Sequence, residues 1–229
     1  RHEAWGSLAR KLAHEIKNPL TPIQLTIDRL KNKYSLEIKE TKAESFRENL
    51  KIINNQIKQI ENLVNEFSDF ARMPKPILRK NNLIDLINEN VKLLNELDKS
   101  IEITFIKNVD NLFLECDKEQ LSRVFLNLIK NSIESIQQKS EKISKFNKKI
   151  TIELFENDTQ ISVIINDTGI GFKNFSKNVR DVLNPYITTK KNGTGLGLSI
   201  VNKIVNDHNG RIEFLSVIEG AKIKITFVK

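Results

Sequence analysis

The chain has 229 residues, of which 39% are hydrophobic and 29% are charged, and its net charge is +8. This length suits one large domain or two small ones, and the apolar content excludes wholesale disorder. The lysines are scattered or lie in expected loops (Lys139, Lys142, Lys145, Lys148 and Lys149), whereas a nucleic-acid binder usually gathers them in a patch with aromatics for stacking. This pattern favours a solvated surface over nucleic-acid binding.

The residues that most often form disulfides and metal sites are sparse. A single cysteine, Cys116, excludes an internal disulfide and a Cys-rich zinc site, and His2, His14 and His208 lack metal-ligand spacing. No apolar run reaches the length of a membrane span. Because the chain begins with Arg1 and its only methionine is Met73, we expect it to be part of a longer protein.

Residues 1 to about 72 show helical periodicity. Two apolar stripes flank a polar stretch at 32–42, which we expect to turn the chain. A hairpin cannot bury such long stripes alone, so we predict a two-fold dimer that forms a four-helix bundle. The first stripe contains Leu8, Leu12, Ile16, Ile23, Ile27 and Leu30, and the second, a heptad seam, contains Phe46, Leu50, Ile53, Ile57, Ile60, Val64 and Phe67.

The sequence Met73-Pro74-Lys75-Pro76 ends the helical segment, because proline cannot continue a helix. We therefore predict a first domain at 1–73, a linker at 74–76 and a second domain at 77–229. In the second domain the periodicity predicts helices at 83–97, 118–136 and 196–207. It predicts strands at 101–106, 149–155, 160–166, 211–217 and 221–228. This mixed order predicts a two-layer α/β sandwich, so the chain as a whole is α+β.

His14 lies on the first predicted helix, roughly opposite its apolar stripe. An exposed imidazole is a usable nucleophile near neutral pH. Glu15 can hold a ring nitrogen or accept its proton, and Asn18 lies one turn further on the same face. Pro19 and Pro22 should bend or loosen the helix just after the histidine. An ordinary exposed histidine on a kinked helix is the alternative.

Asparagine and glycine motifs in the second domain point to nucleotide binding. Asn127 and Asn131 lie one turn apart on a helix, and amide oxygen is a suitable ligand for Mg²⁺. Asp167 follows an apolar strand and opens Asp-Thr-Gly-Ile-Gly, where glycines let the backbone approach a base. Surface asparagines and a tight turn are the alternative interpretations.

Two further features lie in or after a long loop at 172–192. Tyr186 and Lys190 can close over a nucleotide, because loops of this length are often lids. The glycines of 193–197 open a helix, whose N-terminus suits phosphate. The motif lacks the last glycine of a dinucleotide fingerprint and the Gly-Lys-Ser/Thr of a P-loop.

These motifs occur in one order along nearly the whole chain. The motifs at 14–22, 127–131, 167–171, 185–186 and 193–197 resemble the H, N, G1, F and G2 boxes of sensor histidine kinases. The run at 14–25 is similar to nitrogen-regulation kinases of the NtrY type. Tyr186 stands where phenylalanine is usual, and Asn184 where an acidic residue is common.

The resemblance implies a dimerisation and phosphotransfer domain followed by an ATP-binding sandwich of the Bergerat type. It implies that His14 attacks the γ-phosphate of ATP with the help of Glu15 and Asn18, and that Asn131 with Asn127 holds Mg²⁺. The other ATP-binding residues that it implies are Lys130, Asp167, Gly169, Gly171, Tyr186, Thr189, Lys190, Gly193, Thr194, Gly195, Leu196, Gly197 and Leu198.

The resemblance also implies partners. The phosphate would pass to an aspartate of an NtrX-like response regulator receiver domain, with phosphatase activity toward it. The homodimer would be the cytoplasmic portion of an inner-membrane protein and would bind no nucleic acid.

Two other functions stay open on the residues alone. An ATPase or ATP-gated clamp related to gyrase and Hsp90 would share the nucleotide motifs without needing His14. A degenerate kinase would serve only as a dimeric scaffold or phosphatase.

Overall fold

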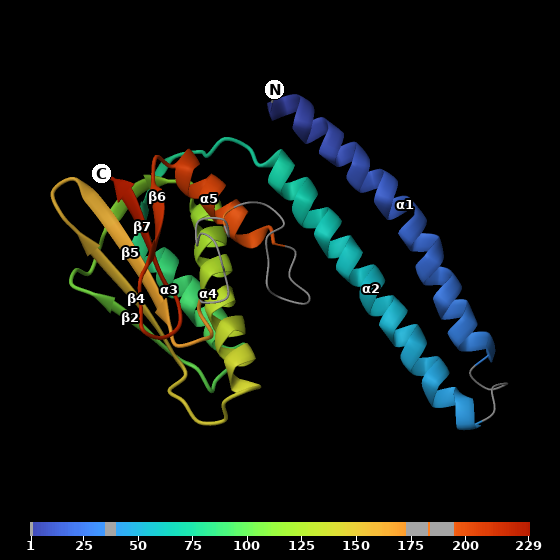
Figure 1. The fold of residues 1–229 in the computed structure, drawn as a ribbon. Coiled ribbons are helices and arrows are strands. Elements are labelled where there is room, and N and C mark those ends of the chain that lie inside the picture. The colour runs from blue at the N-terminus through green and yellow to red at the C-terminus, as the bar shows by residue number, and fades with distance from the viewer. Residues whose placement is uncertain (1, 35–39, 173–182, 184–194) are drawn as a thin grey trace. The chain divides into compact units, whose positions relative to one another are not determined.

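The computed structural model describes residues 2–34, 40–172, 183 and 195–229. The chain divides into two compact units that meet in the sequence between Pro74 and Lys75. One unit is a helical hairpin and the other combines a sheet with three helices (Figure 1). Each unit is built around its own apolar core.

The helical unit consists of α1 (His2–Tyr34) and α2 (Glu40–Arg72), which lie side by side as a hairpin (Figure 1). Its core is formed by Leu20, Ile27, Leu50 and Ile57, with Phe46 packed against them. Helix α1 continues through Pro19 and Pro22 without interruption. The hairpin predicted from the two apolar stripes is therefore confirmed.

The hairpin buries only half of its heptad positions. Every seventh residue from Ala13 and from Leu50 is buried within the hairpin, whereas the second heptad position of each helix stays exposed. The buried set is Ala13, Leu20 and Ile27 with Leu50, Ile57 and Val64, and the exposed set is Ile16, Ile23 and Leu30 with Ile53 and Ile60. An apolar stripe on the surface of both helices favours contact with a further apolar surface.

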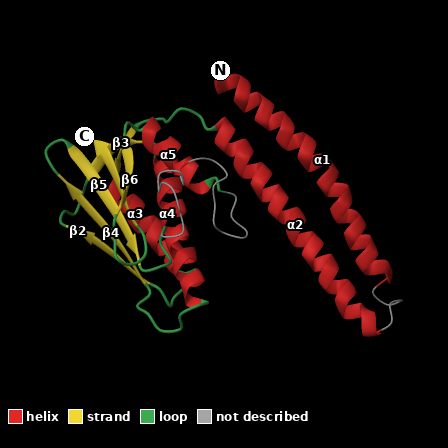
Figure 2. Cartoon of the chain, in the orientation of Figure 1, coloured by secondary structure: helices red, strands yellow, loops and turns green. Residues whose placement is uncertain are grey.

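The second unit contains a five-stranded sheet in the order β2-β4-β5-β7-β6. The strands are β2 (Glu102–Lys107), β4 (Lys149–Glu156), β5 (Gln160–Asp167), β6 (Arg211–Leu215) and β7 (Lys222–Val228). The β2–β4 pair is parallel and the other pairs are antiparallel. Helices α3 (Leu83–Asn95), α4 (Lys118–Ser140) and α5 (Gly197–Asp207) cover one face of the sheet (Figure 2). The predicted two-layer sandwich is confirmed.

Strand register places Asp167 at the end of an apolar row. On β5 the alternating residues Ile161, Val163 and Ile165 are buried, and Asp167 is the next residue on the same face. Asp167 pairs with Ile150 of β4. A carboxylate thus lies at the edge of the core between the sheet and the helices.

Two short strands were missed by sequence periodicity. Strand β1 (Arg79–Asn82) pairs with β3 (Phe113–Cys116) in an antiparallel ribbon. The Nδ2 atom of Asn81 donates to the carbonyl of Cys116 at 2.9 Å, and the Oδ1 atom of Asn82 accepts from the N–H of Ile84 to cap α3. The residues of β1 are polar and have low strand propensity, and the Asn81 side chain adds a hydrogen bond to the backbone pairing of the ribbon.

Asp117 joins three segments of the second unit. Its carboxylate accepts from the N–H of Gln120 and so caps α4, and it also accepts from the N–H of Ile77 at 3.0 Å. Its own N–H donates to Nε2 of the buried His208 at 3.0 Å. Nδ1 therefore carries the ring proton and donates to the carbonyl of Ile204 at 2.8 Å. His208 has a structural role at the end of α5.

Candidate functional site

His14 lies on the exposed face of α1. His14, Glu15 and Asn18 are all exposed, whereas Ala13 and Leu20 on the other side of the helix are buried. Ala13 and Leu20 bury one face of the helix, and His14, about 100° around the helix from Ala13, lies outside that face. The imidazole is therefore open to a reacting group that arrives from outside the hairpin.

Asp167 lies in a buried, hydrogen-bonded environment. Its side chain is only 4% exposed. The Oδ1 atom accepts from the N–H of Gly169 at 2.8 Å and from the N–H of Ala221 at 3.3 Å, and Ser132 adds a side-chain hydrogen bond. Burial raises the pKa of the carboxyl, while these hydrogen bonds and the charge of Lys139 lower it in part.

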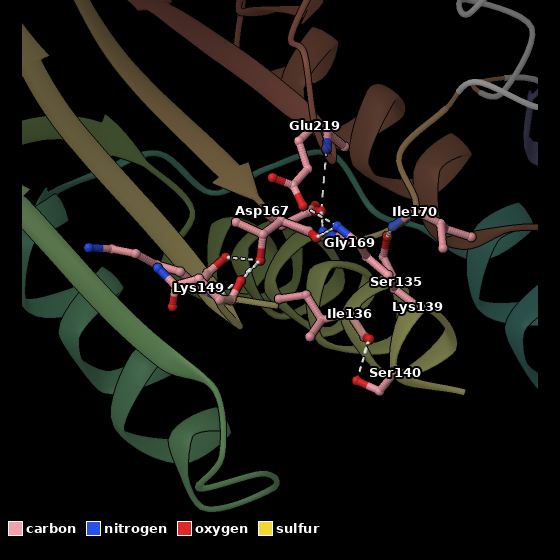
Figure 3. Close-up of polar contacts among 12 residues, drawn as sticks. Ser135, Ile136, Lys139, Ser140, Lys149, Asp167, Gly169, Ile170 and Glu219 are labelled. Carbon is pink, nitrogen blue, oxygen red and sulfur yellow. Dashed lines mark hydrogen bonds and ion pairs between the residues drawn. The ribbon is translucent and has the colours of Figure 1, made fainter. Parts of the chain in front are cut away.

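A polar stripe on α4 holds the turn that begins at Asp167 (Figure 3). Ser132 bonds the Asp167 carboxylate, the Oγ atom of Ser135 accepts from the N–H of Ile170 at 3.0 Å, and the Nζ atom of Lys139 donates to the carbonyl of Thr168 at 2.8 Å. The spacing of three and four residues puts the stripe on one helix face. Sequence analysis did not identify these three residues.

The prediction that Lys139 is a solvated surface lysine is wrong. Its side chain is 12% exposed and forms an ion pair with Glu219, which is 54% exposed. The ammonium also lies 4.5 Å from the centre of the Phe146 ring. Because α4 extends to Ser140 rather than to 136, Lys139 belongs to a helix and faces the turn at 167–170.

Three glycines bring backbone segments together beside Asp167. A Cβ atom added to Gly169 would lie 2.2 Å from Oγ of Ser135. One added to Gly171 (φ +67°) would lie 2.2 Å from the carbonyl oxygen of Gly220, and one added to Gly220 (φ +72°) would lie 1.7 Å from that of Asp167. The glycines at 169 and 171 were predicted, and Gly220 is a further one that the packing requires.

The asparagine pair lies against the start of α5. A Cβ atom on Gly197 would be 3.4 Å from Oδ1 of Asn127 and 4.0 Å from Nδ2 of Asn131. The Nδ2 atom of Asn127 donates to the carbonyl of Arg123 at 2.9 Å, which turns its oxygen toward α5. Two predicted motifs that are far apart in the sequence therefore meet in the second unit.

The remaining predicted residues divide between described and undescribed positions. Lys130 is exposed, with Nζ 4.0 Å from a carboxylate oxygen of Glu134. Gly195 has a φ of +71°, Leu196 is buried and Leu198 is half-buried. Tyr186, Thr189, Lys190, Gly193 and Thr194 lie outside the described residues.

No three His, Cys, Asp or Glu side chains within the described ranges gather in a way that could hold a metal ion. None of the helices among those ranges is long and apolar enough to cross a membrane.

Comparison with protein families assigns both units. The family described as "His Kinase A (phospho-acceptor) domain" matches residues 4–76, and "Histidine kinase-, DNA gyrase B-, and HSP90-like ATPase" matches residues 116–229. The second family implies ATP binding. The two matches together define a phospho-acceptor hairpin followed by an ATPase sandwich.

Individual relatives agree with this assignment. The chain is 40% identical over 228 residues to "Putative sensor histidine kinase NtrY-like" of Rickettsia felis, covering 99% of this chain and 36% of the relative. It is 35% identical to "Nitrogen regulation protein NtrY" of Azorhizobium caulinodans, covering 99% and 29%. The chain thus spans about a third of the length of these relatives.

Among solved structures, histidine kinase ThkA in complex with response regulator protein TrrA matches with a TM-score of 0.67 at 25% identity. The match covers 99% of this chain and 62% of that one. The chain belongs to the sensor histidine kinases.

Proposed function

We propose that this chain is a kinase core in which His14 takes the γ-phosphate of ATP and passes it to an aspartate of a response regulator. The observation that carries the proposal is the exposed His14 of a phospho-acceptor hairpin in the same chain as the buried, hydrogen-bonded Asp167 of an ATPase fold. In this proposal residues 1–73 are the phosphotransfer domain, 74–76 the linker and 77–229 the ATP-binding domain.

The adenine base would be bound by Asp167. A carboxylate that is buried and fixed by Gly169 and Ser132 presents acceptor oxygen in a set direction. The exocyclic amino group of adenine is a donor that fits it. Glycines 169 and 171 keep side chains out of the space beside the turn.

The phosphates would be held at the asparagine pair and α5. The Oδ1 atom of Asn127 faces Gly197 and is of the oxygen type that Mg²⁺ binds, so this position fits the ion together with Asn131. Bound Mg²⁺ would neutralise charge on the transferring phosphoryl group. The proposal includes Lys130, Gly195, Leu196 and Leu198, and also Tyr186, Thr189, Lys190, Gly193 and Thr194, as further nucleotide contacts.

Phosphoryl transfer requires mainly positioning and charge stabilisation. The unprotonated ring nitrogen of His14 would attack the γ-phosphorus of ATP. The bond between that phosphorus and the β–γ bridging oxygen would break, and ADP would leave. Glu15, next to the histidine and exposed, would hold the ring or accept its other proton.

Two partners follow from the hairpin. The exposed heptad set (Ile16, Ile23, Leu30, Ile53 and Ile60) supports a homodimer, because a second hairpin would bury it in a four-helix bundle. Exposure of His14 supports access by a receiver domain, and the similarity to NtrY-like kinases supports an NtrX-like one.

A second activity, dephosphorylation of the regulator, is supported by Asn18. Its amide is exposed one turn from His14, where it can orient the water that attacks a phosphoaspartate. We expect Asn18→Ala to slow dephosphorylation of the regulator more than autophosphorylation of the kinase. Equal loss of both reactions would assign Asn18 to the local fold instead.

Incubation with γ-labelled ATP distinguishes the proposed kinase from the alternatives. The kinase should carry label that is acid-labile and base-stable, as phosphohistidine is. Release of free phosphate without labelled protein would indicate an ATPase. Absence of any turnover would indicate a scaffold.

A further inference from the structure

The ammonium group of Lys139 joins the segments that surround Asp167. It donates to the carbonyl of Thr168, the next residue along the chain, and pairs with Glu219, which directly precedes Gly220. Gly220 in turn packs against the carbonyl of Asp167. Lys139 therefore holds the backbone on both sides of the carboxylate.

Lys139 and Glu219 form an ion pair between the two segments that flank this carboxylate. Lys139 on α4 is the one charge that acts on the pKa of Asp167, and it lowers that pKa. Lys149 of β4 and Lys222 of β7 lie on the opposite face of the sheet by strand alternation, and Lys149 pairs with Glu102.

The two side chains of this ion pair differ in their exposure to solvent. Lys139 is 12% exposed and Glu219 is 54% exposed. The ammonium acts through protein, where charges are screened less, while the carboxylate of Glu219 is largely in water. Lys139 therefore favours the ionised carboxyl of Asp167, and Glu219 weakens this effect by partly neutralising the ammonium.

We propose that Lys139 is a positioning residue for nucleotide recognition, which aligns the Asp167–Ile170 turn and keeps its carboxylate ionised for the adenine amino group. The inference rests on the proposed role of Asp167 in binding adenine. An ionised acceptor forms a stronger hydrogen bond than a neutral one. Lys139 would thus set the affinity for adenine nucleotides without touching the ligand.

The test uses the full chain and measures ADP affinity by calorimetry across a pH series. Lys139→Met should weaken ADP binding about tenfold near neutral pH and move the midpoint of its pH dependence upward. Glu219→Gln should move the midpoint downward. Lys139→Arg retains the charge and should retain the midpoint.

Lys142→Met is the matched control. Lys142 is an exposed lysine one turn further along the chain and lines the same surface pocket as Lys139, next to Gly169 and Gly220. It should bind ADP like the wild type. Titration of the ¹³C carboxyl signal of Asp167 in the nucleotide-free chain should give the same order of midpoints and does not depend on ligand binding.

If Lys139 and Glu219 only stabilised the fold, the two charge variants would not shift the midpoint of the pH dependence in opposite directions. If Lys139→Met and Glu219→Gln weaken ADP binding alike, with unchanged midpoints, Lys139 has no role beyond structure. If the wild-type chain binds no ADP, the proposed function itself fails. Normal binding by all variants would overturn the inference about Lys139 alone.

Discussion

Ser135 of α4 fills the space beside Gly169, so that a Cβ atom at position 169 would lie 2.2 Å from the serine Oγ and 2.7 Å from its carbonyl carbon. Backbone contact of this kind cannot be relieved by rotation of a side chain. The fold therefore needs a glycine at 169, whereas a Cβ at Gly197 would meet atoms only at ordinary contact distances of 3.4 Å and 4.0 Å.

Because of this difference, substitution of Gly169 should reduce stability, whereas substitution of Gly197 should reduce nucleotide binding. Gly169→Ala should destabilise the chain by about 1–3 kcal/mol through overpacking. Gly197→Ala should change stability by less than about 0.5 kcal/mol. The methyl group at 197 would occupy space beside Asn127, so ADP with Mg²⁺ should bind at least about tenfold more weakly. Scanning and titration calorimetry measure the two effects. An equal loss of stability in both variants would refute the distinction.

Asp167→Asn should weaken ADP binding by more than about tenfold, or ~1.4 kcal/mol, because the amide loses the charge of the acceptor. The same variant should be more stable than the wild type at neutral pH. Burial raises the pKa of Asp167 above 3.8 in the folded chain. Ionisation of this carboxyl therefore destabilises the folded chain relative to the unfolded chain. Asparagine keeps an acceptor for Gly169 and Ala221.

The stability difference between Asp167→Asn and the wild type should depend on pH in a defined direction. The folded chain binds the Asp167 proton more tightly than the unfolded chain does. The contribution of this group to stability is therefore fully present below the unfolded pKa and is lost as pH rises through the folded pKa. The stability advantage of Asp167→Asn over the wild type should shrink as pH falls toward 4. A constant difference would argue against a raised pKa.

Much of the fold could be predicted because it depends on periodic burial. The alternation from Ile161 to Ile165 and the heptads of α2 each place apolar residues on one face, and both elements were predicted within about three residues of their observed bounds. Strand β1 has no such pattern, and β3 alternates over only four residues. Their pairing depends on hydrogen bonds of Asn81 with a strand 35 residues away.

Site residues that belong to a local sequence motif could be predicted. Site residues that reach the site only through the packing of a helix could not. Asp167, with a glycine two residues on, is evident from the sequence. Ser132 and Lys139 matter only because α4 turns them toward residues 167–170. In the sequence Lys139 follows the predicted end of its helix at 136, among lysines expected to lie in a loop, and its burial cannot be read from its neighbours.

The lone thiol gives an independent check on the β1–β3 ribbon. Cys116 is fully buried, and this burial, with a further contribution from Asp117, raises its pKa to about 11. At pH 8 the thiolate should therefore be scarce and covered, and a thiol reagent such as DTNB should react only after denaturation. Reaction of the native chain at the rate of the denatured chain would show that the ribbon does not cover Cys116.

Dimer formation should depend on the exposed heptad positions of α2. Ile53→Lys places a charge on that stripe and should shift the chain toward monomer in sedimentation at micromolar concentration. Ile52→Lys is the control, because Ile52 is 56% exposed but lies off the stripe. It should leave the wild-type oligomer intact. A wild-type chain that is only monomeric, or equal effects of both variants, would be inconsistent with the proposed four-helix bundle.

Transfer of labelled phosphate to His14 tests the account most directly. The chain is incubated with γ-labelled ATP and Mg²⁺ beside His14→Gln and Asp167→Asn, and the affinity of each for ADP is measured in parallel. The wild type should carry acid-labile, base-stable label on the peptide that contains His14. His14→Gln should carry none while its ADP affinity stays unchanged, since His14 and Asp167 belong to separate units. Label of the same chemistry in His14→Gln, or on another peptide of the wild type, would contradict the assignment of His14 as the phosphoacceptor.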